Sequence, residues 1–305
     1  MRILTLFLDG IGLGADNPAA NPFASADTPT MHELANGRPW LASTGFQRSE
    51  RAIFIPTDPR LGLPGRPQSG TGQASLLTGL NLPQLTGRHY GPKPDARTRE
   101  IIAESSYFKR LASRGKSARL LTAYPPGLLR NFARGKTLRS SVQQAAFESG
   151  APHFTVEDVI NRRALTAEWT TESWREHLKI EGLPDYSPAE AGSLLAKLAR
   201  SYDFAFHSHW LTDRIGHRGP LARGLEILER FDQLLAGLLE EWQDDEGLIV
   251  ITSDHGNMED LSTRRHTLND IPTLVIGARA PEFAAGFQSL TDFAPACDRM
   301  LFGSR

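Results

Sequence analysis

Acidic and imidazole side chains follow apolar runs in this sequence. The run 247–252 is followed by Asp254 and His255, and the run 2–8 by Asp9. In open α/β sheets, ligands bind outside the carboxyl ends of the strands, so these side chains are expected to share one edge. Carboxylate and imidazole together favour a divalent metal ion. An isolated Asp-His pair could also simply cap backbone groups at the end of a strand.

Two further segments carry residues of the same kind. The run 203–210 leads to Asp213 and His217, and His266 lies in the loop before the run 272–276. Four such segments at one sheet edge could hold two divalent ions about 4 Å apart, with positions left open for a phosphate. Mixed histidine and carboxylate ligands suit Mn²⁺ or Zn²⁺ better than Mg²⁺ or Ca²⁺.

The expected ligands divide into two groups. One group consists of Asp213, His217 and His266, and the other of Asp9, Ser69, Asp254 and His255.

A loop of small residues, Gln68-Ser-Gly-Thr-Gly72, leads into a short apolar segment. Such a loop lets the backbone approach an anion or a nucleophile at a helix N-terminus. The alternative is a Ser or Thr that caps the helix. A second glycine pattern, Gly10-x-Gly12, imitates a dinucleotide fingerprint, but a turn-rich segment follows where a helix should start.

Strands that alternate with helices position these residues. We expect an α/β fold with a mostly parallel sheet between helices. The expected strands are 2–8, 118–123, 203–210, 247–252 and 272–276, and the longest expected helix is 221–242. Residues 48–67 contain four prolines and are expected to be irregular. Because the strand–helix rhythm is lost, we expect residues 91–190 to form an inserted α+β cap and residues 1–90 and 191–305 the catalytic core.

Composition narrows the classes of partner. In 305 residues, 34 Lys and Arg balance 35 Asp and Glu, so no global charge favours nucleic acid or a membrane surface. The run 2–8 is interrupted by Asp9-Gly10, which predicts a first strand and not a signal peptide. A lone cysteine, Cys297, fits a reducing compartment, so a cytoplasmic location is expected. The oligomeric state is left open.

Five segments together resemble the alkaline phosphatase superfamily, in its branch of cofactor-independent phosphoglycerate mutases and phosphopentomutases. The segments are LDGIG, SGTG after Gln68, TDRIGH, TSDHGN and RHTLNDIP. They occur in family order over about half of the chain. The resemblance implies a core with two metal ions, a phosphorylated Ser or Thr and an inserted cap.

The resemblance also implies roles for individual residues. Ser69 takes the nucleophile position, and Thr71 is its rival. Asp9, Asp254 and His255 would hold the ion that activates Ser69, a weak nucleophile when free. The second ion would be held by Asp213, His217 and His266.

Some residues depart from the mutase pattern. Gln73 stands where the mutase loop has a histidine, and His207-Ser208-His209 lies on a core strand, not in the cap. The resemblance therefore implies a phosphoryl-transfer enzyme acting on a small, anionic phosphomonoester. A mutase-like outcome is the first interpretation and a phosphatase the alternative. An NAD-dependent oxidoreductase and a metal-binding protein without catalysis are the remaining alternatives.

Overall fold

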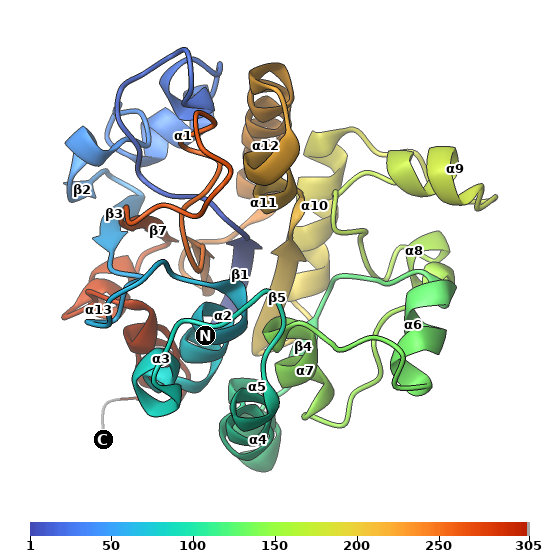
Figure 1. Ribbon diagram of the computed structural model, residues 1–305. Helices are drawn as coiled ribbons and strands as arrows, with labels where there is room; N and C mark the ends of the chain where they lie inside the picture. Colours follow the sequence, from blue (N-terminus) through green and yellow to red (C-terminus); the bar gives the residue numbers. More distant parts are fainter. Residues whose placement is uncertain (304–305) are drawn as a thin grey trace.

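A seven-stranded sheet forms the middle layer of the protein in a computed structural model that describes residues 1–303 (Figure 1). The strand order is β2-β3-β7-β6-β1-β5-β4. The strands are β1 (Arg2–Leu8), β2 (Gln47–Arg48), β3 (Ala52–Thr57), β4 (Ala118–Leu120), β5 (Phe204–His209), β6 (Gly247–Thr252) and β7 (Ile271–Ile276). The predicted α/β class is confirmed.

The sheet is mixed, which refines the expectation of a mostly parallel sheet. The neighbours β6, β1, β5 and β4 are parallel, whereas β7 is antiparallel to β6 and to β3, and β2 is antiparallel to β3. Parallel neighbours need a crossover connection, usually a helix. No helix lies between β6 and β7, so the chain returns directly and β7 runs the opposite way. Residues just before β7 therefore lie at the same edge as residues just after β1, β5 and β6.

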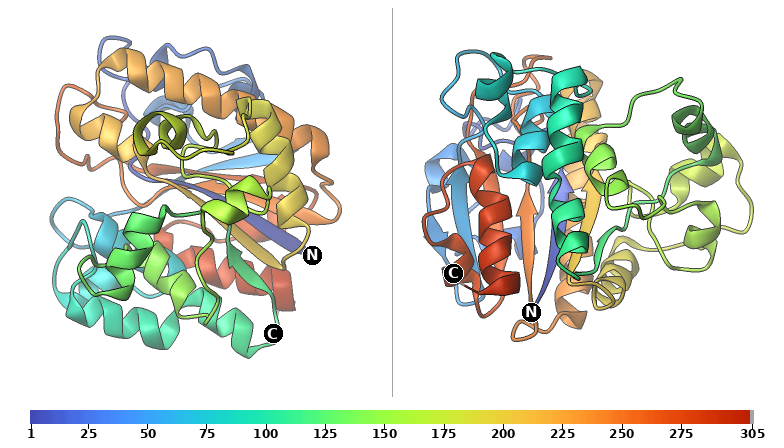
Figure 2. Two further views of the ribbon diagram at one scale, coloured as in Figure 1. Left: turned by 90° about the vertical axis from the view of Figure 1, so that its right-hand side faces the viewer. Right: turned by 90° about the horizontal axis from the view of Figure 1, so that it is seen from below.

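Helices cover both faces of the sheet (Figure 2). On one face, Leu4 and Leu6 of β1 join the core under α1, α10 and α12. On the other face, Ile3 and Phe7 join the core under α2, α4, α5, α7 and α14. The helices are α1 (Pro29–Leu34), α2 (Ser69–Thr78), α3 (Leu82–Thr86), α4 (Ala96–Ser105), α5 (Tyr107–Ser113), α6 (Pro126–Ala133), α7 (Ser141–Phe147), α8 (Val156–Ile160), α9 (Glu172–Leu178), α10 (Pro188–Ala199), α11 (Leu211–Arg218), α12 (Leu221–Glu241), α13 (Ala280–Ala284) and α14 (Phe293–Phe302). Within residues 1–303, no helix is long and apolar enough to cross a membrane.

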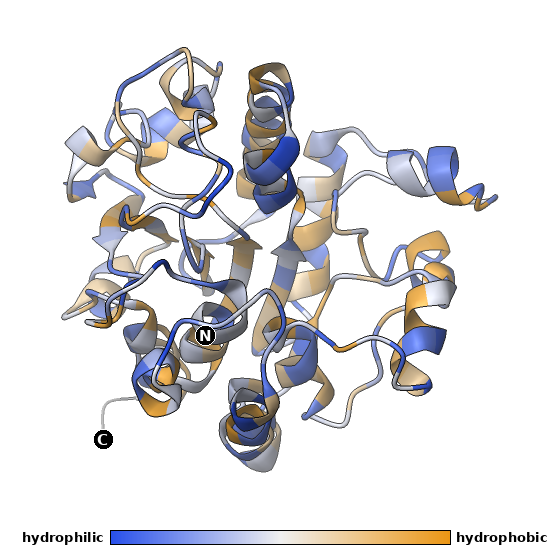
Figure 3. Cartoon of the chain, viewed as in Figure 1, coloured by the Kyte–Doolittle hydropathy of each residue, from blue (hydrophilic) through white to orange (hydrophobic). Residues whose placement is uncertain are grey.

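Helix α12 carries apolar residues at helical spacing, as the sequence predicts (Figure 3). Leu228, Phe231 and Leu235 are buried against the sheet. Helix α10 packs on α12 with direct backbone contact, because a Cβ atom at Gly192 would lie 2.8 Å from the backbone nitrogen of Leu238. This close packing holds one helical layer over the strands that carry the site.

Residues 48–67 are not wholly irregular, because β3 lies within them. Pro56 of β3 faces Pro272 of β7 in the ladder, and neither residue has an N–H to donate. The expectation of an irregular segment was wrong for β3 because proline was taken as a sign against a strand.

The segment 91–190 contributes directly to the core. Strand β4 extends the sheet beside β5, and α4, α5 and α7 join the same apolar core as α2. Helices α6, α8 and α9 lie further from the sheet (Figure 1). Division of the chain at residues 91 and 190 stays a prediction, and a separate cap would comprise only part of that range.

Two buried histidines of β5 predict acid sensitivity. Burial lowers the pKa of His207 to about 4 and that of His209 to about 3, whereas an unfolded histidine titrates near ~6.5. Because the folded-state pKa values are depressed, the stability that these residues contribute is complete above about pH 6.5 and is lost as the pH falls toward 4. We expect the Tm of the metal-free protein to fall across that window in scanning calorimetry.

A pair of variants tests whether His209 causes the loss of stability at low pH. His209 stacks on Trp169 with ring centroids 4.1 Å apart, so His209→Phe keeps a ring there and should reduce the acid dependence. His177→Phe, at an exposed position, should leave it unchanged. Full wild-type acid sensitivity in His209→Phe would show that this histidine is not the cause.

Candidate metal centre

The expected ligand residues meet at the carboxyl edge of β1, β5 and β6. Asp9 directly follows β1, and Asp254 and His255 follow β6 by two residues. Asp213 and His217 lie on α11, which begins two residues after β5 ends. His266 converges with Asp213 and His217 from the loop that enters β7. The antiparallel direction of β7 is what brings that loop to this edge.

One group of ligand atoms consists of Asp213, His217 and His266. The i, i+4 spacing on α11 places Asp213 and His217 on one helix face, with Oδ1 and Nε2 3.4 Å apart. The Nε2 of His266 lies 3.5 Å from the same oxygen and 3.1 Å from the Nε2 of His217. Three ligand atoms thus converge on one point.

A second group consists of Asp9, Asp213 and His255. The Nε2 of His255 lies 3.4 Å from Oδ1 of Asp9 and 3.6 Å from Oδ2 of Asp254. The same Nε2 lies 2.9 Å from the hydroxyl oxygen of Ser69. Asp213 belongs to both groups, so the two are adjacent and share a carboxylate.

The other ring nitrogen of each histidine is fixed by the backbone. The Nδ1 of His266 donates to the carbonyl of Pro67 (2.7 Å), and the Nδ1 of His217 donates to the carbonyl of Arg264 (2.8 Å). A carbonyl can only accept, so in the neutral rings the Nε2 atoms carry lone pairs. Such second contacts fix the tautomer of metal-binding histidines. Two lone pairs 3.1 Å apart repel each other unless a proton or a metal ion lies between them.

Two carboxylate oxygens also fit a bound cation. Oδ1 of Asp9 and Oδ2 of Asp254 are buried, with no hydrogen-bond partner among residues 1–303. Buried anionic oxygens are costly unless they are paired or bind a metal. The donor set therefore fits divalent metal ions.

Two acidic residues of the centre, Asp9 and Asp213, have shifted pKa values. Burial, followed by the nearby Asp254 carboxylate, raises the pKa of Asp9 well above its usual value. Burial alone would raise the pKa of Asp213 as well, but the nearby His266 and His255 outweigh it and hold this pKa at about 2. Clustered carboxylates of this kind are typical of functional sites.

Helix α2 begins at Ser69, which is only 6% exposed. Its hydroxyl faces His255, whereas the hydroxyl of Thr71 accepts a hydrogen bond from the backbone N–H of Tyr90 (3.1 Å). The Thr71 side chain thus holds the loop at residue 90 against α2. Of the two expected nucleophile candidates, only Ser69 has its hydroxyl oxygen within hydrogen-bond distance of a candidate metal ligand.

Three residues without an assigned role in the sequence support the ligands. Nε2 of Gln73 donates to Oδ2 of Asp9 (3.0 Å), and Nδ2 of Asn257 donates to Oδ1 of Asp213 (2.8 Å). Glu259 is fully buried and accepts from the backbone N–H groups of Gly12 (3.0 Å) and Asn257 (2.7 Å). The signal for Asn257 and Glu259 was their position directly after the Asp254-His255 pair.

Glu259 also accepts from Thr267 and from the Asn269 amide (3.0 Å), and therefore joins the loop after β1 to two parts of the connection between β6 and β7. An amide cannot accept at its NH₂ group, so Glu259→Gln should leave at least one buried donor unpaired. We expect the free energy of unfolding to fall by about 1–3 kcal/mol, measured by urea denaturation of the metal-free protein. Glu282→Gln, at a surface ion pair, is the control. Equal losses in both variants would contradict the role given to Glu259.

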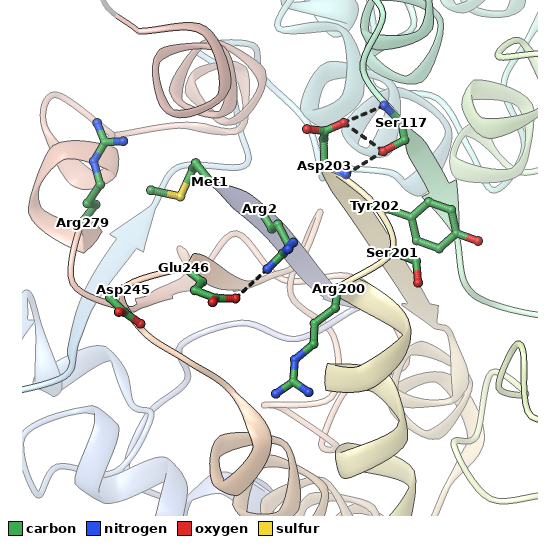
Figure 4. A pocket seen from close by; sticks show the side chains of 10 residues that line it. All are labelled: Met1, Arg2, Ser117, Arg200, Ser201, Tyr202, Asp203, Asp245, Glu246 and Arg279. Atoms are coloured by element: carbon green, nitrogen blue, oxygen red, sulfur yellow. Dashed lines mark hydrogen bonds and ion pairs between the residues drawn. The ribbon is translucent and has the colours of Figure 1, made fainter.

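A hollow of about 570 Å³ lies at the opposite edge of the sheet (Figure 4). It is lined by residues at or just before the start of β1, β4, β5 and β6, including Arg2, Ser117, Asp203 and Glu246. Arg2 and Glu246 pair with each other there at 2.7 Å. The hollow contains none of the converging ligands and is separate from the candidate metal centre.

Known proteins match this chain in sequence and in fold. Residues 184–300 match the family model of the metalloenzyme superfamily. A 2,3-bisphosphoglycerate-independent phosphoglycerate mutase of Methylobacillus flagellatus is 32% identical over 39% of this chain and 25% of its own length. The enzyme of that name from Legionella pneumophila is 24% identical over 70% of this chain and 44% of its own length. The chain thus spans less than half the length of these curated relatives.

The PH0037 protein of Pyrococcus horikoshii has a similar fold. It matches with a TM-score of 0.57 and 17% identity, covering 100% of this chain and 97% of that one. The family-model match covers α11, β6 and the loop with His266, which carry most of the converging ligands. Over residues 184–300 the chain therefore resembles the metalloenzyme superfamily, and the curated relatives that it matches are phosphoglycerate mutases.

Proposed function

We propose that the protein is a metal-dependent phosphoryl-transfer enzyme that acts on a small phosphomonoester through a phosphoserine at Ser69. The observation that carries this proposal is the 2.9 Å approach of the Ser69 hydroxyl to Nε2 of His255, within a cluster of metal-capable side chains. A nucleophile at the first residue of a buried helix also lies among backbone N–H groups, which favour a phosphate.

The proposed ligand sets combine the two groups of atoms with Asp254 and Ser69, which lie beside His255. Asp213, His217 and His266 would hold one ion, and Asp9, Asp254, His255 and Ser69 the other, with the Asp213 carboxylate close to both. Bound there, Mn²⁺ or Zn²⁺ would lower the pKa of the serine hydroxyl and neutralise phosphoryl oxygens.

The reaction on this chain is a substitution at phosphorus. The Ser69 oxygen forms a bond to phosphorus while the bond from phosphorus to the substrate oxygen breaks, and the hydroxyl proton is passed to the released substrate oxygen. In a second substitution, another oxygen takes the phosphoryl group and Ser69 is regenerated. That oxygen belongs to the substrate in a mutase and to water in a phosphatase.

Both outcomes have support. The mutase names of the curated relatives favour transfer to a second substrate oxygen. The phosphatase alternative is favoured by solvent access, since the His217 side chain is 37% exposed and that of Asp213 21%. A mutase has to exclude water from the phosphorylated intermediate.

The fold around Gly12 and Gly14 does not favour the alternative of a dinucleotide-binding site. The N–H of Gly12 donates to Glu259, and a Cβ atom at Gly14 would lie 2.6 Å from the Glu259 carbonyl. The protein itself therefore fills the space that a pyrophosphate would need. Absence of NAD binding in calorimetry is the expected result.

A direct assay tests the proposal. The protein, loaded with Mn²⁺ or Zn²⁺, is incubated with phosphorylated sugars and phosphoglycerates, while free phosphate, isomerised product and phosphoserine are followed. Isomerisation supports a mutase and free phosphate a phosphatase. If no phosphoserine, isomer or free phosphate forms from any of these compounds, the proposed function is wrong, and the non-catalytic metal-binding alternative would gain support.

A further inference from the structure

The segment 90–93 is attached to the first turn of α2. The carbonyl of Tyr90 accepts from the N–H of Thr71 (3.0 Å), and the N–H of Tyr90 donates to the Thr71 hydroxyl (3.1 Å). A Cβ atom at Gly70 would lie 2.5 Å from the Tyr90 carbonyl oxygen and 2.8 Å from that of Lys93. Lys93 is therefore held beside the residue that follows Ser69, by backbone contacts that leave little room for movement.

The Lys93 side chain is a cation without a close partner. It is partly buried, and among residues 1–303 its Nζ makes no hydrogen bond or ion pair. The partly buried Lys116, in contrast, pairs with Asp203 at 2.9 Å. Burial lowers the pKa of Lys93, and the charge of Asp9 opposes that change. Lys93 in turn opposes the rise of the Asp9 pKa, which agrees with the position of its backbone beside the first turn of α2.

The charge balance of the centre indicates what Lys93 would bind. Three carboxylates, Asp9, Asp213 and Asp254, lie in the cluster, and two divalent ions would more than neutralise them. The Asp9 carboxylate would then be neutralised by a metal ion and would no longer be available to pair with the Lys93 ammonium group. A phosphomonoester is close to a dianion at neutral pH, and charge-assisted hydrogen bonds from an ammonium group to phosphate are strong.

We propose that Lys93 binds the phosphoryl group that Ser69 accepts, as a specificity-determining residue for phosphomonoester dianions. The proposal rests on the proposed function, since it takes Ser69 as the acceptor. In the competing interpretation, Lys93 only balances the acidic ligands before metal ions bind. The two interpretations differ in whether loss of the charge changes phosphate binding or metal binding.

Three variants separate them. Lys93→Met keeps an unbranched side chain without charge, Lys93→Arg keeps the charge, and Lys136→Met is a control at an exposed lysine. Each protein is loaded with metal, its metal content is measured by elemental analysis, and it is titrated with inorganic phosphate in a calorimeter. The KM for a phosphomonoester and the phosphoserine fraction in single turnover are additional readouts.

We expect Lys93→Met to weaken phosphate binding at least about tenfold, as for loss of a hydrogen bond to a charged group. Lys93→Arg should retain most of the affinity, Lys136→Met should match the wild type, and metal content should stay unchanged in all three. Unchanged phosphate affinity in Lys93→Met would overturn the proposal. A change confined to metal affinity would overturn it as well, in favour of charge balance.

The same measurements distinguish a failure of the proposed function from a failure of the inference about Lys93. If the wild type binds phosphate and loses that affinity with Lys93→Met, but never forms phosphoserine, then Lys93 is a phosphate-binding residue and Ser69 is not the acceptor. That result would reject the proposal as stated together with the proposed function. If phosphoserine forms in the wild type and equally in Lys93→Met, at equal KM and equal phosphate affinity, only the inference about Lys93 is rejected.

Discussion

Replacement of Ser69 by alanine is expected to abolish phosphoenzyme formation and to lower turnover by at least about 10³-fold, as for loss of other nucleophiles. The reason is that the hydroxyl oxygen of Ser69 lies 2.9 Å from His255, inside the ligand cluster. Phosphorylation is measured as the mass of one added phosphoryl group on the tryptic peptide that contains residue 69. Metal content should be mostly retained, because the Asp and His side chains remain.

Thr71 provides the matched control. Its hydroxyl accepts from the N–H of Tyr90, so Thr71→Ser should keep both that contact and the activity. Thr71→Val should lower stability through the loop at residue 90 without preventing phosphorylation of Ser69. Phosphate found on residue 71 in the Ser69→Ala protein would contradict the assignment of the nucleophile.

Replacement of Asp213 by alanine is expected to weaken binding of both metal ions, by at least about 100-fold for the more affected one. Loss of a supporting contact alone costs about 10–100-fold in metal affinity. Asp213 belongs to both groups of converging atoms, whereas His217 belongs to one. His217→Ala should therefore leave about one ion per chain, and Asp213→Ala less. Elemental analysis after gel filtration, combined with titration against a chelator, measures both quantities.

An exposed acid serves as the control for charge. Asp245 lies at the opposite edge of the sheet, where Asp245→Ala removes one negative charge without touching the centre. Its metal content should equal that of the wild type. Two tightly bound ions in Asp213→Ala, or the same loss in Asp245→Ala, would contradict the ligand assignment.

The convergence of the candidate ligands that follow parallel strands could be predicted from the sequence alone. Asp9 comes directly after a continuous apolar run, and Asp254 and His255 come two and three residues after another; buried parallel strands have this pattern. Their carboxyl ends must meet at one edge, so the convergence follows from local pattern and chain direction. The spacing of Asp213 and His217 likewise places both on one helix face.

Other features depended on pairing between distant segments, which local pattern does not encode. His266 reaches the centre because β7 runs antiparallel to β6. Strand β3 was not predicted because its proline was read as a sign of irregular structure, whereas the proline is tolerated opposite another proline of β7. The place of β4 in the main sheet depends on its ladder with β5, more than eighty positions further along the chain.

The sequence by itself determined the chemistry of this protein: the residue types, their place at strand ends and the superfamily to which they point. Only the tertiary structure decided how they act on one another. It made Asp213 common to both groups of converging atoms, placed the amide of Gln73 against Asp9, and attached the segment with Lys93 to the first turn of α2. The physical reason is that strand ends are fixed by short-range pattern, whereas contacts of a few ångströms between side chains depend on how loops from separate strands pack together.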